Sequence, residues 1–277
     1  VKSLKIPPAY TKVKINCDEN AKLQAYGYDD KNRKQYIYHP KFYEESKEIK
    51  FEDLLHFARK INRIKKDINR SLSQSVETNI PDKNQVICLI LSLIDKCNFR
   101  IGNEKYKELY NSYGVTTLNK EHFDIKKNYI VISFIGKKGV KNKSIVNNKY
   151  LNFLIIKLIN LYGDEDYLFC YKDSENKCTR VTESQVNNFL KKYHKSLSVK
   201  MFRTYNANYL LLKNLLDLSF PSNEKEAKKN LSIALGKAAE ALHHSKTVSK
   251  NSYMNNKIVD LYLNNYGEFK DILNDFK

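Results

Sequence analysis

Residues 243–254 have the sequence HHSKTVSKNSYM, in which His244 precedes Tyr253 by nine positions. Tyr253 begins an amphipathic segment that predicts one last helix over residues 253–276, with apolar positions that include Ile258, Tyr262, Ile272 and Phe276. Most tyrosines are simply packing residues, and this chain has 20 of them. Tyr253 becomes a candidate nucleophile for a phosphodiester only if other segments supply cationic groups around it.

The composition predicts a folded and strongly basic protein. A length of 277 residues is enough for one large domain, or for a small domain and a larger one, and the hydrophobic content of 42% argues against global disorder. The net charge of +18 favours a polyanionic partner, most simply nucleic acid, although a merely basic surface is the alternative. No apolar run is long enough to cross a membrane and no signal peptide is evident, so we expect a soluble, intracellular protein.

Cysteine and arginine are both used sparingly. The five cysteines are odd in number and contain no C-x-x-C pair, so we expect neither a disulfide framework nor a zinc site. Of the 49 basic residues only seven are arginines. Because lysine supplies a point charge at most positions, an arginine in a distinctive context is a candidate for the planar fork that binds phosphate oxygens. The seven are Arg33, Arg59, Arg63, Arg70, Arg100, Arg180 and Arg203.

The chain changes character near residue 48. Before it, residues 35–39 predict a short strand in which Tyr36 and Tyr38 share a face, suited to nucleic-acid contacts or simply to an edge strand with surface tyrosines. From Glu48 onward, apolar residues recur at helical spacing and predict a long helix. We therefore expect two domains, a β-rich one over residues 1–48 and a mainly helical one over residues 49–277.

Two cationic groups follow predicted regular elements. Val86–Ile94 is almost continuously apolar and predicts a buried helix, so Arg100 just behind it can be held rigidly. Residues 129–135 and 141–146 predict a β-hairpin with Lys137 and Lys138 at its tip, where a lysine is usually only solvated. Val115–Leu118 predicts a further short strand.

The remainder is predicted to be helical. We expect helices over residues 150–162, 182–193, 200–216 and 222–242, followed by the last helix. Thr182 and Gln185 have the spacing of a capping box, and Ser222 is a candidate cap. No P-loop, dinucleotide fingerprint or internal repeat is present in the sequence.

Taken in order, these groups resemble a known family, the type IB DNA topoisomerases, and in particular its compact poxvirus-like and bacterial-like branch. Each motif is weak alone, but their common order and spacing make the resemblance specific, and together they cover most of the chain. The matching stretches are Arg33–Pro40, Phe99–Tyr106, Gly114–Leu118, Phe134–Lys137, Lys200–Tyr205 and His244–Tyr253.

The resemblance implies an α+β fold, with a small β-rich N-terminal DNA-clamping domain before a mostly α-helical catalytic domain that carries a short antiparallel β-hairpin sheet. It implies an isomerase that relaxes supercoiled double-stranded DNA by transient single-strand cleavage and religation, without metal, ATP or other cofactor. A monomer would act as a clamp around DNA, in a virion or host cytoplasm if viral and otherwise in the cytoplasm or nucleoid. By resemblance, the DNA contacts would be Gln35, Tyr36, Tyr38, Lys105, Tyr106, Lys138, Lys200 and Asn208.

The same resemblance implies a role for each catalytic residue. Tyr253 would become linked to a 3′-phosphate and release a 5′-hydroxyl, although a phenol with a pKa of ~10 needs help to attack at neutral pH. Arg100, Arg203 and His244 would donate hydrogen bonds to the non-bridging oxygens in the transition state. Lys137 would protonate the leaving oxygen as general acid, and Lys200 would assist it or bind a nearby phosphate.

The sequence departs from the family at three positions. His243 stands where the family usually has glycine, so local backbone geometry and the choice between His243 and His244 depend on the fold. Asn103 replaces a frequent basic residue, and Lys138 replaces a frequent acidic one. These last two departures bear on target-site preference rather than on the chemistry.

Two other functions compete with this interpretation. A tyrosine recombinase or integrase would share the catalytic core and the phosphotyrosyl intermediate, but recombinases typically carry histidine where this chain has Lys200. A non-catalytic basic DNA-binding protein would explain the net charge, but not the ordered Arg, Lys, Arg, His and Tyr.

Overall fold

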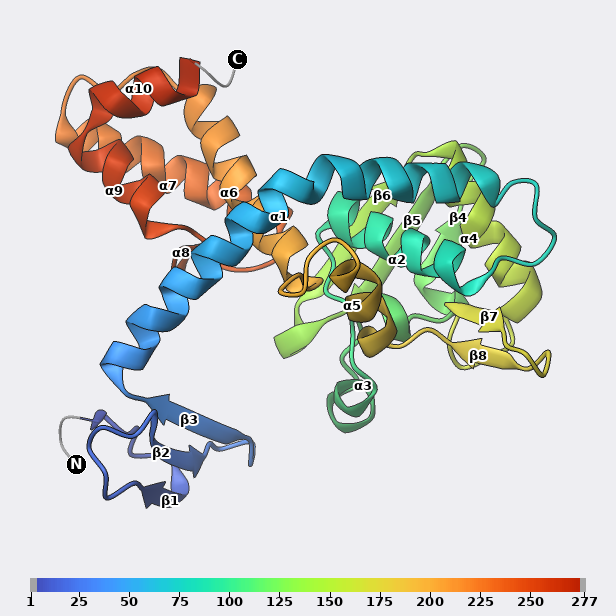
Figure 1. The fold of residues 1–277 in the computed structure, drawn as a ribbon, viewed down its shortest axis with the longest axis horizontal. Helices are drawn as coiled ribbons and strands as arrows, with labels where there is room; N and C mark the ends of the chain where they lie inside the picture. The colour runs from blue at the N-terminus through green and yellow to red at the C-terminus, as the bar shows by residue number, and fades with distance from the viewer. Residues whose placement is uncertain (1–3, 275–277) are drawn as a thin grey trace. The chain divides into compact units, whose positions relative to one another are not determined.

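The computed structural model describes residues 4–274 and has an α+β architecture of helices with small antiparallel sheets, which confirms the predicted fold class (Figure 1). The chain forms two compact units, Val1–Asp53 and Leu54–Lys277. Their boundary falls within a helix, and the domain division expected after residue 48 stays a prediction. None of the described helices is long and apolar enough to cross a membrane.

The N-terminal unit contains a three-stranded antiparallel sheet of β1 (Thr11–Ile15), β2 (Leu23–Tyr28) and β3 (Lys34–Tyr38), in that order. The predicted strand at residues 35–39 is therefore confirmed, with its start and end one residue earlier. Asp29 builds the turn before β3, because its carboxylate accepts hydrogen bonds from the backbone of Lys31 and Arg33. Across the sheet, Tyr26 pairs with Tyr36.

The long helix α1 (Pro40–Gln74) begins eight residues before its predicted start at Glu48. Proline has no backbone N–H, and the N–H groups in the first turn of a helix have no intrahelical partner. Proline is therefore favoured there. Within the second unit, α1 buries one apolar stripe, consisting of Leu54, Phe57, Ile61, Ile64, Ile68 and Leu72.

The first core of the second unit packs helices against a sheet. Its centre is α2 (Lys83–Cys97), which begins with a capping box between Asp82 and Gln85 and buries most of its side chains. The sheet is β4 (Phe123–Ile125), β5 (Ile130–Ile135) and β6 (Lys141–Val146), joined by antiparallel pairing, and α4 (Lys149–Tyr162) belongs to the same core. The predicted hairpin and both predicted helices are confirmed.

Around this core lie smaller elements. They are α3 (Glu104–Tyr110), β7 (Cys170–Lys172), β8 (Cys178–Arg180) and α5 (Glu183–Lys191). The capping box of α5 at Thr182 is confirmed, whereas α3, β7 and β8 were not predicted. The expected strand at Val115–Leu118 is wrong, because Val115–Thr117 is a 3₁₀ turn. There the hydroxyl of Thr117 bonds the backbone of Gly114 and draws the chain into a turn.

The second core consists of helices alone. It combines α6 (Lys200–Leu216), α7 (Glu224–Ala241), α9 (Asn256–Asn264) and α10 (Tyr266–Asn274), with the short α8 (Lys246–Ser252) after α7. The prediction for α6 is confirmed, and α7 is capped by Asn223 rather than Ser222. In Figure 1 these helices form the orange to red group.

The single last helix predicted over residues 253–276 is wrong. Two short helices, α9 and α10, take its place after the turn at Tyr253, because Asn255 caps the start of α9 and Asn265 ends it. Asparagine side chains compete with the helical backbone for hydrogen bonds, so asparagine is a frequent helix boundary. Phe276 and the side chain of Ile272 lie outside the described residues.

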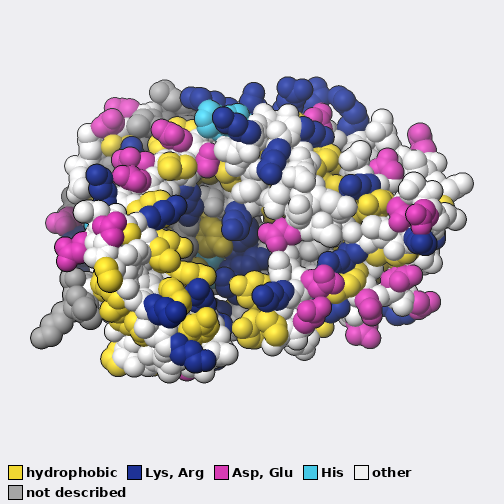
Figure 2. Space-filling view, turned by 60° about the horizontal axis from the view of Figure 1, so that its bottom comes forward, with side chains coloured by type: hydrophobic (Ala, Val, Ile, Leu, Met, Phe, Trp, Pro, Cys, Tyr) yellow, Lys and Arg dark blue, Asp and Glu magenta, His cyan; other side chains and the backbone are white. Residues whose placement is uncertain are grey.

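Helix α6 joins the two cores, since Phe202 is buried in the first and Ala207 and Leu211 are buried in the second. The side chains between these anchors therefore sit where the two cores meet. All five cysteines are free thiols. Lysine and arginine side chains are spread over the face shown in Figure 2, as the net charge requires.

Candidate active site

Tyr253 lies in the turn after α8 rather than inside a helix, and a buried asparagine holds that turn. Asn208 on α6 donates from its amide nitrogen to the carbonyl oxygen of Tyr253 at 2.9 Å and to that of Thr204 at 2.8 Å. Its amide oxygen accepts from the backbone N–H of Asn255 at 2.9 Å. The Asn208 side chain thus fixes the backbone on both sides of Tyr253.

This position differs from the DNA contact expected for Asn208. The residue is only 5% exposed, and its amide is fully engaged with the protein backbone. In this structure its side chain therefore holds the backbone around Tyr253, and the DNA contact stays a prediction. No spacing in the sequence distinguishes a buried asparagine of this kind from a surface one.

Arg203 approaches the Tyr253 phenol from α6. Its Nε donates a long hydrogen bond of 3.4 Å to the phenol oxygen, and one Nη donates to the carbonyl oxygen of Leu242 at 2.8 Å. The residue is 4% exposed, and the other Nη is buried without a hydrogen-bond partner among the described residues. A guanidinium held in this way keeps one donor ready for an anionic oxygen beside Tyr253.

His244 packs against the same tyrosine. The two ring centroids are 4.9 Å apart, and both ring nitrogens of His244 are buried without a hydrogen-bond partner in the described part of the chain. Burial, followed by the charges of Arg203 and Arg100, lowers the pKa of His244 to about 4. The imidazole is consequently neutral at pH 7, with one N–H to donate.

His243 faces a different environment. Its Nε2 lies 3.2 Å from the carbonyl oxygen of Cys97, and its ring packs on Phe99 at 5.7 Å between centroids. Its backbone φ is +54°, in the left-handed region that favours glycine. This conformation accounts for the glycine typical of the family at this position, which is a histidine in this chain.

Arg100 is held by its backbone neighbours rather than by a helix. Phe99 is fully buried beside it, and the carbonyl oxygen of Arg100 accepts from the N–H of Val115 at 2.9 Å. The next carbonyl, of Ile101, accepts from the backbone N–H of Thr116 at 2.7 Å. The Phe99–Gly102 segment is therefore fastened to the 3₁₀ turn that follows Gly114.

Two glycines make this fastening possible. Gly102 has a φ of +96°, and a Cβ added to Gly114 would lie 2.4 Å from the nitrogen of Gly102. No side chain fits between the two backbones at that distance. The two motifs that contain Arg100 and Gly114 are thus one structural unit.

Lys137 lies in the turn between β5 and β6, at the tip of the predicted hairpin. The turn is closed by a hydrogen bond from the N–H of Gly136 to the carbonyl oxygen of Val140 at 2.8 Å. The buried amide of Asn142 donates to the same oxygen at 2.9 Å. Lys138 follows with a φ of +64° and is exposed.

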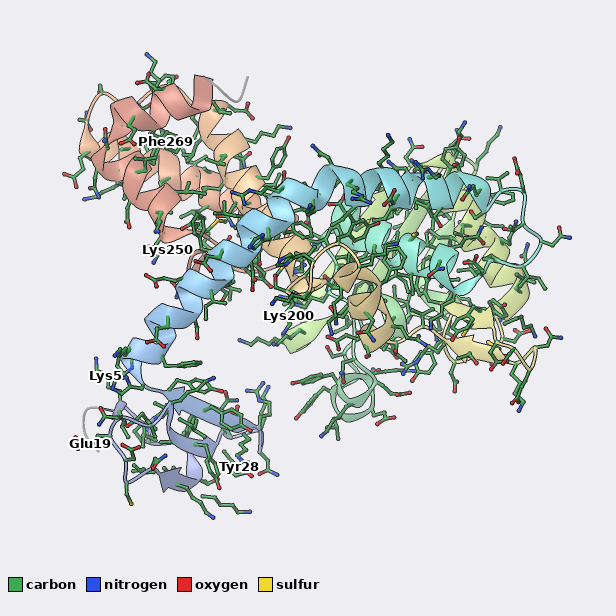
Figure 3. The ribbon with its side chains drawn as sticks, viewed as in Figure 1. Lys5, Glu19, Tyr28, Lys200, Lys250 and Phe269 are labelled. Atoms are coloured by element: carbon green, nitrogen blue, oxygen red, sulfur yellow. The ribbon has the colours of Figure 1, made fainter. Side chains whose placement is uncertain are left out.

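The charges of the predicted catalytic residues act on one another. Desolvation, followed by the charge of Arg100 and, more weakly, those of Lys138 and Lys200, lowers the pKa of Lys137, while Tyr253 opposes this effect. Lys200 is exposed in the first turn of α6 and is labelled in Figure 3. A lowered pKa makes the Lys137 ammonium a better proton donor near neutral pH.

The Tyr253 phenol is subject to two opposing effects. Burial raises its pKa, but the charges of Arg203 and Arg100 and their hydrogen bonds to the phenol oxygen outweigh burial, so the pKa lies below its ordinary value. The two nearby cations therefore stabilise the phenolate form of Tyr253. The structure thus brings Tyr253, Arg203, His244, Arg100 and Lys137 into one electrostatic neighbourhood.

The remaining predicted DNA contacts lie apart from this cluster in the sequence. On α3, Lys105 and Tyr106 are exposed, and Tyr106 packs loosely on Tyr110. In the N-terminal unit, Tyr36 and Tyr38 are 49% and 44% exposed and stack on each other, whereas Gln35 donates to Asp29 at 3.0 Å.

The described residues contain no group of three or more His, Cys, Asp or Glu side chains placed to hold a metal ion. The cations of the cluster are instead provided by Arg100, Lys137 and Arg203, and its donors and acceptors by His244 and Tyr253. Such an arrangement suits reactions in which negative charge develops on phosphate oxygens.

Comparison with known proteins agrees with this chemistry. Residues 39–276 match the family model "Eukaryotic DNA topoisomerase I, catalytic core", and residues 1–29 match "Bacterial DNA topoisomerase IB, N-terminal domain". DNA topoisomerase 1B of Acanthamoeba polyphaga mimivirus is 34% identical over 99% of this chain and 82% of its own length. DNA topoisomerase 1B of vaccinia virus (strain Copenhagen) is 26% identical over 85% of this chain and 71% of its own. The chain belongs to the type IB DNA topoisomerase family.

Among solved structures, that of the XerH site-specific recombinase bound to palindromic difH substrate in a post-cleavage complex is also similar. It has a TM-score of 0.41 and 16% sequence identity, and the match covers 71% of this chain and 49% of that one. A likeness at this level does not separate the functions considered.

Proposed function

We propose that this chain relaxes supercoiled duplex DNA through a 3′-phosphotyrosyl intermediate formed by Tyr253. Membership of the type IB family supports the reaction, and one observation supports the assignment of the nucleophile. The Tyr253 side chain, with its lowered pKa, contacts both the guanidinium of Arg203 and the ring of His244. Neither metal nor ATP takes part in the proposed reaction.

Each step forms one phosphorus–oxygen bond, breaks another and delivers one proton to the leaving oxygen. The phenolate oxygen of Tyr253, its proton lost to solvent, attacks the phosphorus, and the bond from phosphorus to the 5′-oxygen breaks. Arg100, Arg203 and His244 donate to the non-bridging oxygens as negative charge grows there. Lys137 gives a proton to the leaving 5′-oxygen, assisted by Lys200. Religation runs the same steps in reverse after the strand has rotated.

Asn208 has a different role in this proposal. It does not touch the phosphate but positions Tyr253 by holding the backbone on both sides of it. A reacting oxygen must be placed within a fraction of an ångström for efficient attack, so a rigid support at the turn contributes to the rate.

We also propose that the chain acts as a monomer that closes around double-stranded DNA. Exposed tyrosines on β3 and the match of residues 1–29 to a bacterial type IB N-terminal domain support a DNA-binding role for the N-terminal part. We propose further that the protein acts inside a cell or a virion. Its similarity to virus-encoded topoisomerases supports this location.

The test is plasmid relaxation in EDTA without ATP. We expect the wild-type chain to relax supercoiled plasmid and Tyr253→Phe to lose relaxation while keeping its affinity for DNA. Tyr209→Phe is the matched control, because Tyr209 is 54% exposed on α6 and should relax DNA normally. Relaxation by Tyr253→Phe would show that another residue is the nucleophile, and recombination of paired sites without relaxation would favour a recombinase.

A further inference from the structure

Basic side chains are common on this surface, so positive charge alone does not single out a binding site (Figure 2). Arginine is more informative, because the chain has only seven against 42 lysines. Arg33 and Arg180 form ion pairs with Asp29 and Glu104 at 2.7 and 2.8 Å. Arg100 and Arg203 belong to the candidate active site.

The other three arginines all lie on one face of α1. Arg59, Arg63 and Arg70, together with Lys66, recur at intervals of four, three and four residues, so they form a single stripe along the helix. All four side chains are exposed. At ~1.5 Å of rise per residue the stripe is about 16 Å long. We call these four residues the α1 stripe.

The α1 stripe faces away from the core. The buried positions of α1, which include Phe57, Ile61 and Ile64, pack into the first core, and Phe57 touches Phe202 of α6 at 4.9 Å between ring centroids. With ~3.6 residues per turn, the stripe is rotated about 200° around the helix axis from this buried face. A ligand on the stripe is therefore separated from α6, the helix that carries Arg203, by α1 itself.

None of the four cations of the stripe forms an ion pair within residues 4–274. Asp67, the acidic residue between them in sequence, accepts a hydrogen bond from the hydroxyl of Tyr193 at 2.8 Å. The planar guanidinium of arginine can donate two parallel hydrogen bonds to a phosphate group. A row of arginines can therefore contact a row of backbone phosphates.

We propose that the α1 stripe binds the phosphate backbone of a second DNA duplex while the first occupies the active site. The chain would then hold two duplex segments together, and it would favour DNA in which segments cross, as they do in supercoiled plasmids. This proposal goes beyond the relaxation chemistry and rests only on DNA binding by the chain. Its test is therefore independent of whether Tyr253 is the nucleophile.

The experiment measures capture of one duplex by another through the protein. A duplex is fixed to beads and loaded with a limiting amount of the full chain, and a labelled free duplex is added at increasing salt. We expect wild type to retain the labelled duplex, with a log–log salt slope of about −3 to −4 for four phosphate contacts. Replacing all four stripe residues by glutamine should reduce capture at least tenfold.

Three matched measurements separate the stripe from general charge. Replacing Lys213, Lys225, Lys229 and Lys237, exposed residues of α6 and α7, by glutamine removes the same charge and should leave capture unchanged. Arg59→Lys, Arg63→Lys and Arg70→Lys together keep the charge and should weaken capture only a few-fold. The rate at which each variant cleaves a short single duplex should equal that of wild type.

Three results would overturn the proposal. The first is a wild-type chain that captures no second duplex. The second is equal loss of capture in the stripe and control variants, which would reduce the effect to net charge. The third is a stripe variant that cleaves the short duplex more slowly, which would place the stripe in the primary DNA-binding surface.

Discussion

His243 and His244 are neighbours in the chain but have separate surroundings. His244 packs on Tyr253, and neither of its ring nitrogens has a hydrogen-bond partner among the residues that the structure describes, whereas His243 is directed to the carbonyl of Cys97. The left-handed backbone of His243 turns the chain between them, so the two rings leave it in different directions. Spacing to Tyr253 favoured His244 in the sequence, and the structure supplies a physical reason for that choice.

We expect the two histidines to respond differently to substitution. His244→Ala removes a donor near the phosphate and should slow cleavage by about 10²- to 10³-fold. His243→Gly relieves left-handed strain of about 1 kcal/mol and loses a hydrogen bond of similar worth, so cleavage should stay close to wild type. Single-turnover cleavage of a short duplex measures both. A stronger defect in His243→Gly than in His244→Ala would reverse the assignment.

At the scale of elements, the close approach of Gly102 and Gly114 links two motifs that are separate in the sequence. The 3₁₀ turn of Val115–Thr117 is part of this contact and was predicted as a strand. Short β-branched runs favour strands locally, but here hydrogen bonds to the backbone of Arg100 and Ile101 decide the conformation.

Gly114→Ala should disturb this contact. Its Cβ would meet the nitrogen and Cα of Gly102 at 2.4 and 2.5 Å, so the backbone that holds Arg100 must move. Overpacking of this kind costs about 1–3 kcal/mol, and we expect a lower melting temperature and much slower cleavage.

The control for Gly114→Ala is Gly267→Ala in α10, where an added Cβ meets nothing within 4 Å. This control should leave both the melting temperature and the cleavage rate unchanged. Normal cleavage by Gly114→Ala would show that the position of Arg100 does not depend on the glycine contact.

At the scale of the whole molecule, the half-buried His243 and His244 couple stability to pH. The pKa of His244 falls from 6.5 in the unfolded chain to about 4 in the folded one, chiefly through burial. Between these values the unfolded state binds more protons, so stability is complete above pH 6.5 and is lost as the pH falls towards 4. His244 accounts for at most about 3 kcal/mol of this loss, less any screening by solvent.

Thermal unfolding between pH 7 and pH 4 measures this coupling. We expect His244→Gln to lose less stability than wild type as the pH falls, because its side chain does not titrate. Since the pKa of His243 is also lowered by burial, some pH dependence should remain in the variant. Identical pH profiles for wild type and His244→Gln would mean that His244 is not desolvated in the folded protein.

The sequence by itself determined the fold class, the hairpin, the buried helix α2 and the family, because periodicity and motif order are properties of the chain alone. It also identified the five candidate catalytic residues in order. The tertiary structure decided how they meet, since Arg203 and Tyr253 are fifty residues apart and come together only where α6 joins the two cores.

Two elements were predicted wrongly for a shared physical cause, and the burial of Asn208 has the same origin. The last helix breaks at Asn255 and Asn265, Val115–Thr117 forms a turn, and Asn208 is buried under Tyr253. In each case a polar side chain bonds a backbone group that local propensity assigns to another partner. Only the packing of distant segments makes those bonds available. The Tyr253 turn is therefore a product of the tertiary structure, although its tyrosine was evident in the sequence.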